Sequence, residues 1–157
     1  MAENDTRLER AGDLVKAYML AAVVIGLVPL PLAGIAALAA IQLKMLHSLA
    51  NLYESEFSSQ LGTSLIASFL GGGIPILVRG ALRRSIPLYG WGGLAVGLVS
   101  TSVFAGASTY AIGKVFIQHF ESGGTFLTFD PQAVRDYYAQ QFKKGKEEVR
   151  SFVGVKP

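Results

Sequence analysis

Charged residues are absent from three long stretches of the chain. Residues 17–43, 57–78 and 85–113 contain no Asp, Glu, Lys or Arg over 27, 22 and 29 positions. A helix needs roughly 20 apolar residues to cross a hydrocarbon core of about 30 Å, so each stretch is long enough by count. A chain of 157 residues also has too little polar surface to enclose 78 uncharged ones in a soluble core. The pattern therefore predicts membrane association.

Proline and glycine divide these stretches into helices. The pattern predicts helices over residues 6–28, 32–53, 55–70, 76–85, 93–120 and 131–153. Pro29 and Pro31 remove backbone donors, so we expect a tight hairpin turn between the first two helices. Asp130 followed by Pro131 predicts the start of the last one. Acidic residues before the first stretch and its length argue against a cleaved signal peptide.

The last helix is amphipathic, and basic residues gather beside its apolar face. They are Lys143, Lys144, Lys146 and Arg150, and a second basic cluster precedes the third uncharged stretch at Arg79, Arg83 and Arg84. Both clusters suit contact with anionic lipid headgroups, at about 1 kcal/mol per residue. A solvated helix face is an equal alternative for the C-terminal cluster. The positive-inside bias predicts that both clusters are cytoplasmic. Residues 85–113 would then dip and return at the glycines, cross twice, or lie buried among other helices.

Small residues recur at every fourth position of the longest uncharged stretch. They are Gly93, Gly97, Thr101, Ala105, Thr109 and Gly113. Such stripes let two helices approach closely in a membrane, so we expect a helix-association face, between subunits of a homo-oligomer. The alternative is that glycine and alanine are common in this chain and the spacing arises by chance. Whether the partner helix belongs to the same chain stays open.

The residues needed for most catalytic and metal chemistry are missing. The chain has no cysteine, only two histidines 72 positions apart, and no Gly-x-x-x-x-Gly-Lys-Ser/Thr, Gly-x-Ser-x-Gly or His-Glu-x-x-His motif. We therefore expect no enzyme activity, no cofactor and no metal. The net charge is +3 with a pI near 9.3, but the basic residues are dispersed, which argues against nucleic-acid binding.

Polar side chains inside the uncharged stretches allow a second interpretation. Gln42, Ser100, Ser102 and Ser108 are candidates to line a small polar conduit. Hydroxyl groups on membrane helices more often bond to neighbouring helices or to their own backbone, and we favour that arrangement.

Three groups of segments carry a family resemblance. They are residues 28–31 with 42–45 and 49–53, residues 86–97, and residues 109–114 with Tyr137 and Tyr138 behind them. Together they resemble the domain of unknown function 697, the YcjF-type bacterial inner-membrane family, over residues 20–145. One departure lies at residues 32–35, where the family often carries an acidic residue. The resemblance implies an inner-membrane protein associated with Era-like or dynamin-like GTPases, acting as a platform for them.

These observations predict an all-α, membrane-associated protein of helical hairpins with an amphipathic C-terminal helix on the cytoplasmic surface. We expect one domain over residues 1–157, with a polar segment at 1–16, an apolar helical membrane region at 17–120, and a connector and last helix at 121–157. The expected function is a non-catalytic oligomeric scaffold that shapes membrane or recruits a GTPase partner. The alternatives are a pore or channel subunit with a hydroxyl- and glycine-lined conduit and a soluble oligomer with an apolar core.

Overall fold

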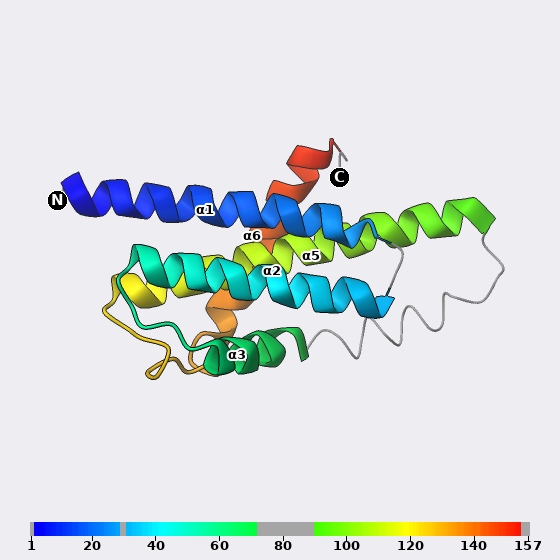
Figure 1. Cartoon of the computed structure of the whole chain (residues 1–157). Coiled ribbons are helices and arrows are strands. Elements are labelled where there is room, and N and C mark those ends of the chain that lie inside the picture. Colours follow the sequence, from blue (N-terminus) through cyan, green and yellow to red (C-terminus); the bar gives the residue numbers. More distant parts are fainter. Residues whose placement is uncertain (1, 29–30, 72–89, 155–157) are drawn as a thin grey trace.

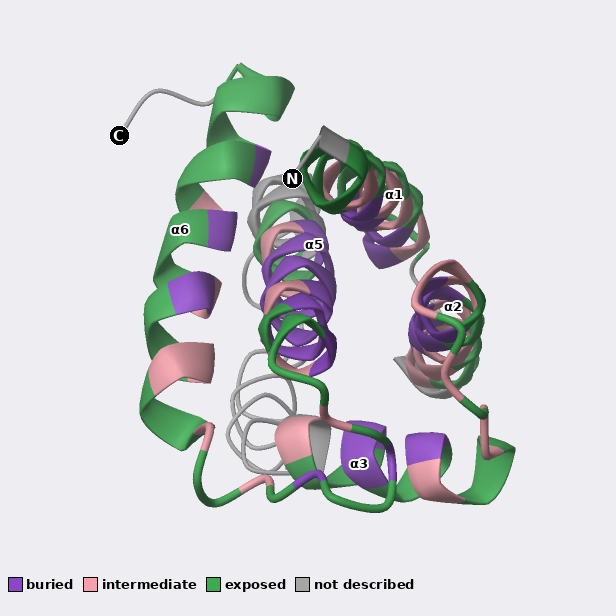
Figure 2. Ribbon diagram, turned by 90° about the vertical axis from the view of Figure 1, so that its left-hand side faces the viewer, coloured by how far each residue is buried: buried purple, intermediate pink, exposed green. Residues whose placement is uncertain are grey.

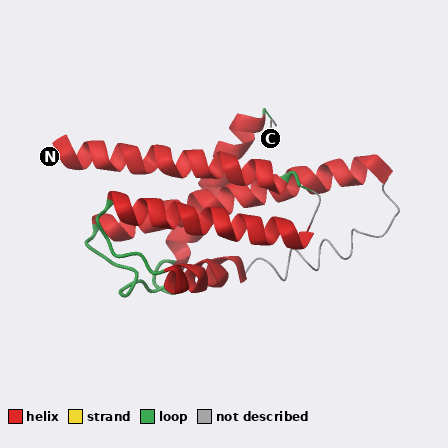
Figure 3. Ribbon diagram, in the orientation of Figure 1, coloured by secondary structure: helices red, strands yellow, loops and turns green. Residues whose placement is uncertain are grey.

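The computed structural model describes residues 2–28, 31–71 and 90–154, and helices make up most of these ranges (Figure 3). The helices are α1 (Ala2–Gly26), α2 (Pro31–Leu52), α3 (Ser59–Gly71), α5 (Gly90–Glu121) and α6 (Arg135–Val153). No strand occurs within these described ranges, so the predicted all-α class is confirmed. Pro31 is the first residue of α2, whereas Pro29 lies outside the described residues. So does the predicted basic helix, with Arg79, Arg83 and Arg84.

Three long helices lie side by side, with α1 antiparallel to both α2 and α5 (Figure 1). The first turns of α5 extend beyond the adjacent ends of α1 and α2. Helix α6 packs across α5, with its buried positions turned towards the bundle (Figure 2). Helix α3 packs against α2 and α5. Helix α5 therefore lies at the centre, in contact with every other helix described.

Close approach between α1 and α5 depends on glycines. A Cβ atom on Gly26 would meet the backbone of Ser102, and one on Gly113 would lie 2.5 Å from a methyl group of Val15. Gly106 of α5 lies in the same way against Val23. Because glycine adds no side chain, the two helices can pack almost backbone to backbone.

Aromatic packing fixes the end of the bundle where α1 begins and where α2 and α5 terminate. Phe116 of α5 stacks on Phe129, with ring centroids 4.4 Å apart. The Tyr53 hydroxyl donates to Glu121 Oε1 at 2.6 Å, and the Arg7 guanidinium lies 5.0 Å above the Tyr53 ring. Burial, and then this hydrogen bond, raise the pKa of Tyr53 well above its usual range. We call this the polar end.

The predicted start of the last helix is wrong by four residues. Instead of capping a helix, the Asp130 carboxylate accepts a hydrogen bond from the Gln132 N–H at 2.9 Å. Residues 131–134 form turns, and α6 begins at Arg135 with no side-chain cap on Val134. An aspartate can satisfy the backbone two residues on in a turn as readily as at a helix start, so the Asp-Pro pair does not distinguish the two.

Candidate membrane-contact site

Opposite the polar end, the described residues of the bundle form an end without charges. It comprises residues 17–28 of α1 and the following turn, 33–43 of α2 and 97–113 of α5, and we call it the apolar end. Val24 of α1 and Leu27 of the following turn are 65% and 48% exposed there, and Val28 and Val99 are also exposed. The contact between Gly26 and Ser102 brings these α1 and α5 side chains to the same end of the molecule. Large apolar side chains exposed together mark a surface that contacts lipid or another protein.

The turn after α1 divides the first uncharged stretch into two helical arms. Residues 17–43 count as one possible membrane crossing, but the turn folds them into two antiparallel arms. Each arm has about 12 or 13 uncharged residues, roughly 18–20 Å of helix at 1.5 Å per residue. Neither arm alone crosses a hydrocarbon core of about 30 Å. The hairpin has the length to enter one side of a bilayer and return.

Among the described residues, one helical segment is long and apolar enough to cross a membrane, Ala33–Leu52 of α2. A third of its most apolar window is buried inside the chain. Met45, Leu46 and Leu49 belong to that buried part and are fully enclosed. The apolar character of the second half of α2 therefore reflects the protein core, and only its first half lies in the apolar end.

Helix α6 crosses α5 within the uncharged segment 97–113, at residues 106–110. Gly145 lies against Ala107 and Tyr110, and Val149 lies against Gly106. Of the predicted headgroup residues on α6, Lys143, Lys144 and Arg150 are exposed and Lys146 is partly buried. The structure thus places the C-terminal basic cluster beside uncharged helix surface.

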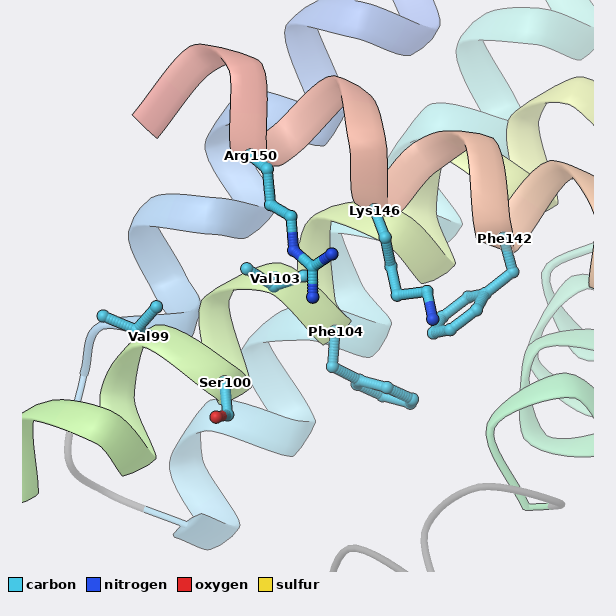
Figure 4. Close-up of a pocket in the computed structure, with 7 residues that line it drawn as sticks. All are labelled: Val99, Ser100, Val103, Phe104, Phe142, Lys146 and Arg150. Carbon is cyan, nitrogen blue, oxygen red and sulfur yellow. The ribbon is translucent and has the colours of Figure 1, made fainter. Parts of the chain in front are cut away.

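A groove separates α5 from α6 on the side of α6 that faces the apolar end (Figure 4). Its lining residues are Val99, Ser100, Val103, Phe104, Phe142, Lys146 and Arg150. Phe104 and Phe142 meet at 5.7 Å between ring centroids, and Lys146 Nζ lies 5.6 Å from the centroid of the Phe142 ring. Figure 4 shows the Arg150 guanidinium directed from α6 towards Val103. The groove combines an apolar floor with two cations.

Further basic residues gather on the other side of α6. Lys114 of α5 is partly buried, with Nζ 5.6 Å from the centroid of the Tyr110 ring. Burial lowers the pKa of Lys114, and the nearby charges of Lys16 and Lys144 lower it further, against the effect of Glu148. Sequence reasoning missed Lys16 and Lys114. Their positions in the sequence could have identified them, because each is the first charged residue beyond an uncharged stretch.

The predicted stripe of small residues does not form one face in the structure. Gly97 and Thr101 are exposed, Ala105 is buried, Thr109 faces α2 and Gly113 faces α1. The side chains around Gly93 lie outside the described ones. Four residues turn an α-helix by about 400°, so successive members of the stripe drift by about 40° and circle the helix by about 200° over five steps. The first part of the stripe is thus open, and association between subunits stays a prediction.

The polar side chain in the middle of α2 bonds to hydroxyl groups of α5. Gln42 Nε2 donates to Ser108 Oγ and Thr109 Oγ1, each at 3.2 Å. Both hydroxyls donate in turn to the carbonyl oxygen of Ala105, at 3.1 and 2.8 Å. All of these side chains are buried. The expectation that such hydroxyls bond to a neighbouring helix and to their own backbone is confirmed.

The structure holds no arrangement typical of a metal centre in the residues it describes, where no three His, Asp or Glu side chains group together. His119 Nε2 lies 2.8 Å from the carbonyl oxygen of Thr125, so the ring is bonded to the turn that follows α5. The ring of His47 packs 4.7 Å from that of Phe57.

Comparison with known proteins places the chain in a family. A curated relative, the magnetosome membrane protein 22 of Magnetospirillum gryphiswaldense, is 47% identical over 140 residues, which cover 87% of this chain and 70% of the relative. No solved structure matches the chain. Residues 3–147 match the family described as domain of unknown function (DUF697), which agrees with the resemblance seen in the sequence. Since this match covers most of the chain, the protein belongs to the DUF697 family.

Proposed function

We propose that the protein is a non-catalytic membrane scaffold whose apolar end enters a bilayer while its polar end stays in water. The observation that carries this proposal is the exposure of Val24, Leu27 and Val28 at an end whose described residues carry no charges. The name of the magnetosome membrane relative supports a membrane location. The family description itself names no activity.

The direction of α6 supports the same arrangement. If the axis of α1 and α5 enters the bilayer, α6 lies along the membrane surface because it crosses them (Figure 2). An amphipathic helix with basic residues is suited to that plane, where cations meet lipid phosphates. The level at which α6 crosses α5 then corresponds to the headgroup region.

Extraction of membranes with alkaline carbonate tests this function. We expect the full chain to stay with the membrane pellet and to need detergent for release. Replacing both Val24 and Leu27 by Glu puts two charges into the apolar end, so this variant should shift to the soluble fraction. Leu8→Glu is the control, because Leu8 is 46% exposed on the same helix but lies at the polar end. Recovery of the unchanged chain in the soluble fraction would contradict the proposal.

The proposal extends to location and partners. We place the protein in a bacterial inner membrane with α6 on the cytoplasmic side, as a homo-oligomer that shapes the membrane or recruits a GTPase to its polar end. The GTPase partner rests on the family resemblance alone. A pull-down of the full chain in mild detergent tests it, since a GTPase should be recovered with the chain and should be absent from a control with an unrelated membrane protein.

A pore is the alternative that the sequence leaves open. Ser108 and Thr109 are buried inside the chain and bonded to Gln42, so they are not available to line a conduit in this arrangement. No feature of the described residues favours a pore over a scaffold. A conductance assay in liposomes separates the two, and we expect no channel activity.

A further inference from the structure

The α5–α6 groove has two cations, and neither has an acidic partner among the described residues. Lys146 and Arg150 are four residues apart on α6, so their side chains lie on the same face of the helix and repel each other. Within the described part of the chain, neither forms an ion pair with a carboxylate group. Lys146 is also partly buried against Phe142. A pair of like charges beside an apolar surface favours binding of an anion between them.

The neighbouring lysines of the same helix are placed differently. Lys143 and Lys144 have Glu147 and Glu148 four residues later, and Glu147 also stands three residues before Arg150, so the spacing of charges along the helix does not separate the two pairs. Neither lysine lines the groove. Of the four residues of the basic cluster on α6, Lys146 and Arg150 therefore line the groove, and Lys143 and Lys144 do not.

The floor of the groove leads from the cations towards the apolar end. Val103 and Phe104 lie next to α6, and Val99 lies one turn further along α5, where it is exposed. An occupant must therefore be anionic at one end and apolar along its length. A phospholipid has this chemistry, with its phosphate at Lys146 and Arg150 and an acyl chain along α5.

We propose that the groove between α5 and α6 binds one anionic phospholipid, its phosphate held by Lys146 and Arg150 and an acyl chain lying on Val99 and Val103. The site selects a lipid with net negative charge, because a choline headgroup would bring a further cation towards Lys146 and Arg150. This site rests on the proposed insertion of the apolar end, since that insertion brings lipid to the groove.

Native mass spectrometry of the full chain tests the site, with dioleoylphosphatidylglycerol and dioleoylphosphatidylcholine as probes in detergent. The variant Lys146→Gln with Arg150→Gln removes both groove cations. The matched control, Lys143→Gln with Lys144→Gln, removes the same charge from the same helix. Each cation near an anionic headgroup strengthens binding several-fold, so we expect the groove variant to bind phosphatidylglycerol more weakly by about tenfold or more. We expect the affinity of the control variant to stay within about twofold of that of the unchanged chain.

A second variant tests the floor of the groove without changing charge. Val103→Trp fills the space beside Arg150, so it should weaken phosphatidylglycerol binding while both cations remain. Circular dichroism of each variant verifies that the helices are retained. Glycerol 3-phosphate, which has the phosphate without acyl chains, should not compete, and competition by it would assign the groove to a free phosphate.

Equal losses in the two charge variants would overturn the site, because a diffuse basic surface predicts that result. Equal binding of the two lipids would overturn it as well. Carbonate extraction separates this outcome from failure of the proposed function, since the groove variant should remain in the membrane pellet through its intact apolar end. If the unchanged chain leaves the membrane, the proposed function fails, whatever the lipid preference in detergent.

Discussion

Gly26 of α1 lies directly against the backbone of Ser102 in α5, with no room between them for a methyl group. This contact fixes the position of the α1–α2 turn along the axis of α5. It therefore determines which apolar side chains lie together at the apolar end. Gly26→Ala should lower the free energy of unfolding by about 1–3 kcal/mol, because the obstructing atoms belong to backbone and cannot rotate away. Denaturation in mild detergent, followed by circular dichroism, measures the change.

Gly97→Ala is the matched control for that substitution. No described atom lies within 4 Å of the Cβ position of Gly97, which sits in the exposed part of α5. Alanine is a better helix former than glycine, so Gly97→Ala should stabilise the protein by about 0.5–1 kcal/mol. Similar effects of the two substitutions would show that the close contact of α1 with α5 is not formed.

Gln42 provides a second test of packing, between α2 and α5. Gln42→Ala leaves a cavity and should cost about 2–4 kcal/mol of unfolding free energy. Gln42→Leu keeps the volume, and Ser108 and Thr109 still have the Ala105 carbonyl oxygen as their acceptor. Gln42 Oε1 accepts no hydrogen bond within the described residues, so leucine also removes a buried unsatisfied atom. We expect Gln42→Leu to cost less than about 1.5 kcal/mol, and an equal loss in both variants would show that the amide itself is required.

Much of this fold follows from local signals. The helix breaks come from Pro31 and the glycines, and the predicted ranges 32–53 and 93–120 agree with α2 and α5 within a few residues. Helix α3 begins at Ser59 and not at Ser55, because Glu54 adopts a left-handed backbone with φ of 52° and a loop follows it. Such details depend on tertiary contacts that the local sequence does not contain.

The candidate site was predictable only in part. The sequence shows a basic cluster on α6. It does not show that Lys146 lines a groove and that Lys144 does not. That distinction depends on where α6 crosses α5, which Gly145 sets by its contact with Ala107. The regular four-residue spacing of small residues also does not predict one common face. Residues at this spacing wind slowly around the axis of a straight helix.

Self-association can now be tested with a substitution that leaves the monomer intact. Gly97→Leu adds bulk where the described structure has open space, so it should weaken self-association without unfolding the chain. Overpacking of about 1–3 kcal/mol changes an assembly constant roughly five- to a hundredfold. Val96→Leu, at the next position around the helix, is the control. Ala105→Leu is less informative because Ala105 is buried within the chain.

Mass photometry or crosslinking in detergent gives the oligomer distribution for these variants. A Gly97→Leu protein with the same distribution and stability as the unchanged chain would mean that this part of α5 faces lipid. The oligomeric scaffold would then lose the support of the small-residue stripe.

Sidedness is tested by cysteine labelling, which is clean because the chain has no cysteine of its own. Ser151 lies at the end of α6, and Ser85 lies outside the described residues, next to Arg83 and Arg84. If the protein enters the bilayer from one side, a membrane-impermeant maleimide should label Ser85→Cys and Ser151→Cys from the same side of oriented vesicles. Labelling from opposite sides would show a complete crossing between them.

The central claim is that the uncharged end of the bundle is the end that enters the membrane. Leu8 and Leu27 test it most directly, because both lie on α1 or its following turn and are 46% and 48% exposed, at opposite ends. A fluorophore is attached to Leu8→Cys or Leu27→Cys in the full chain, and the protein is reconstituted into vesicles with brominated acyl chains. We predict strong quenching by the lipid at position 27 and little at position 8, with the reverse order for a water-soluble quencher in detergent-free vesicles. Equal quenching by the water-soluble agent at both positions would contradict the account.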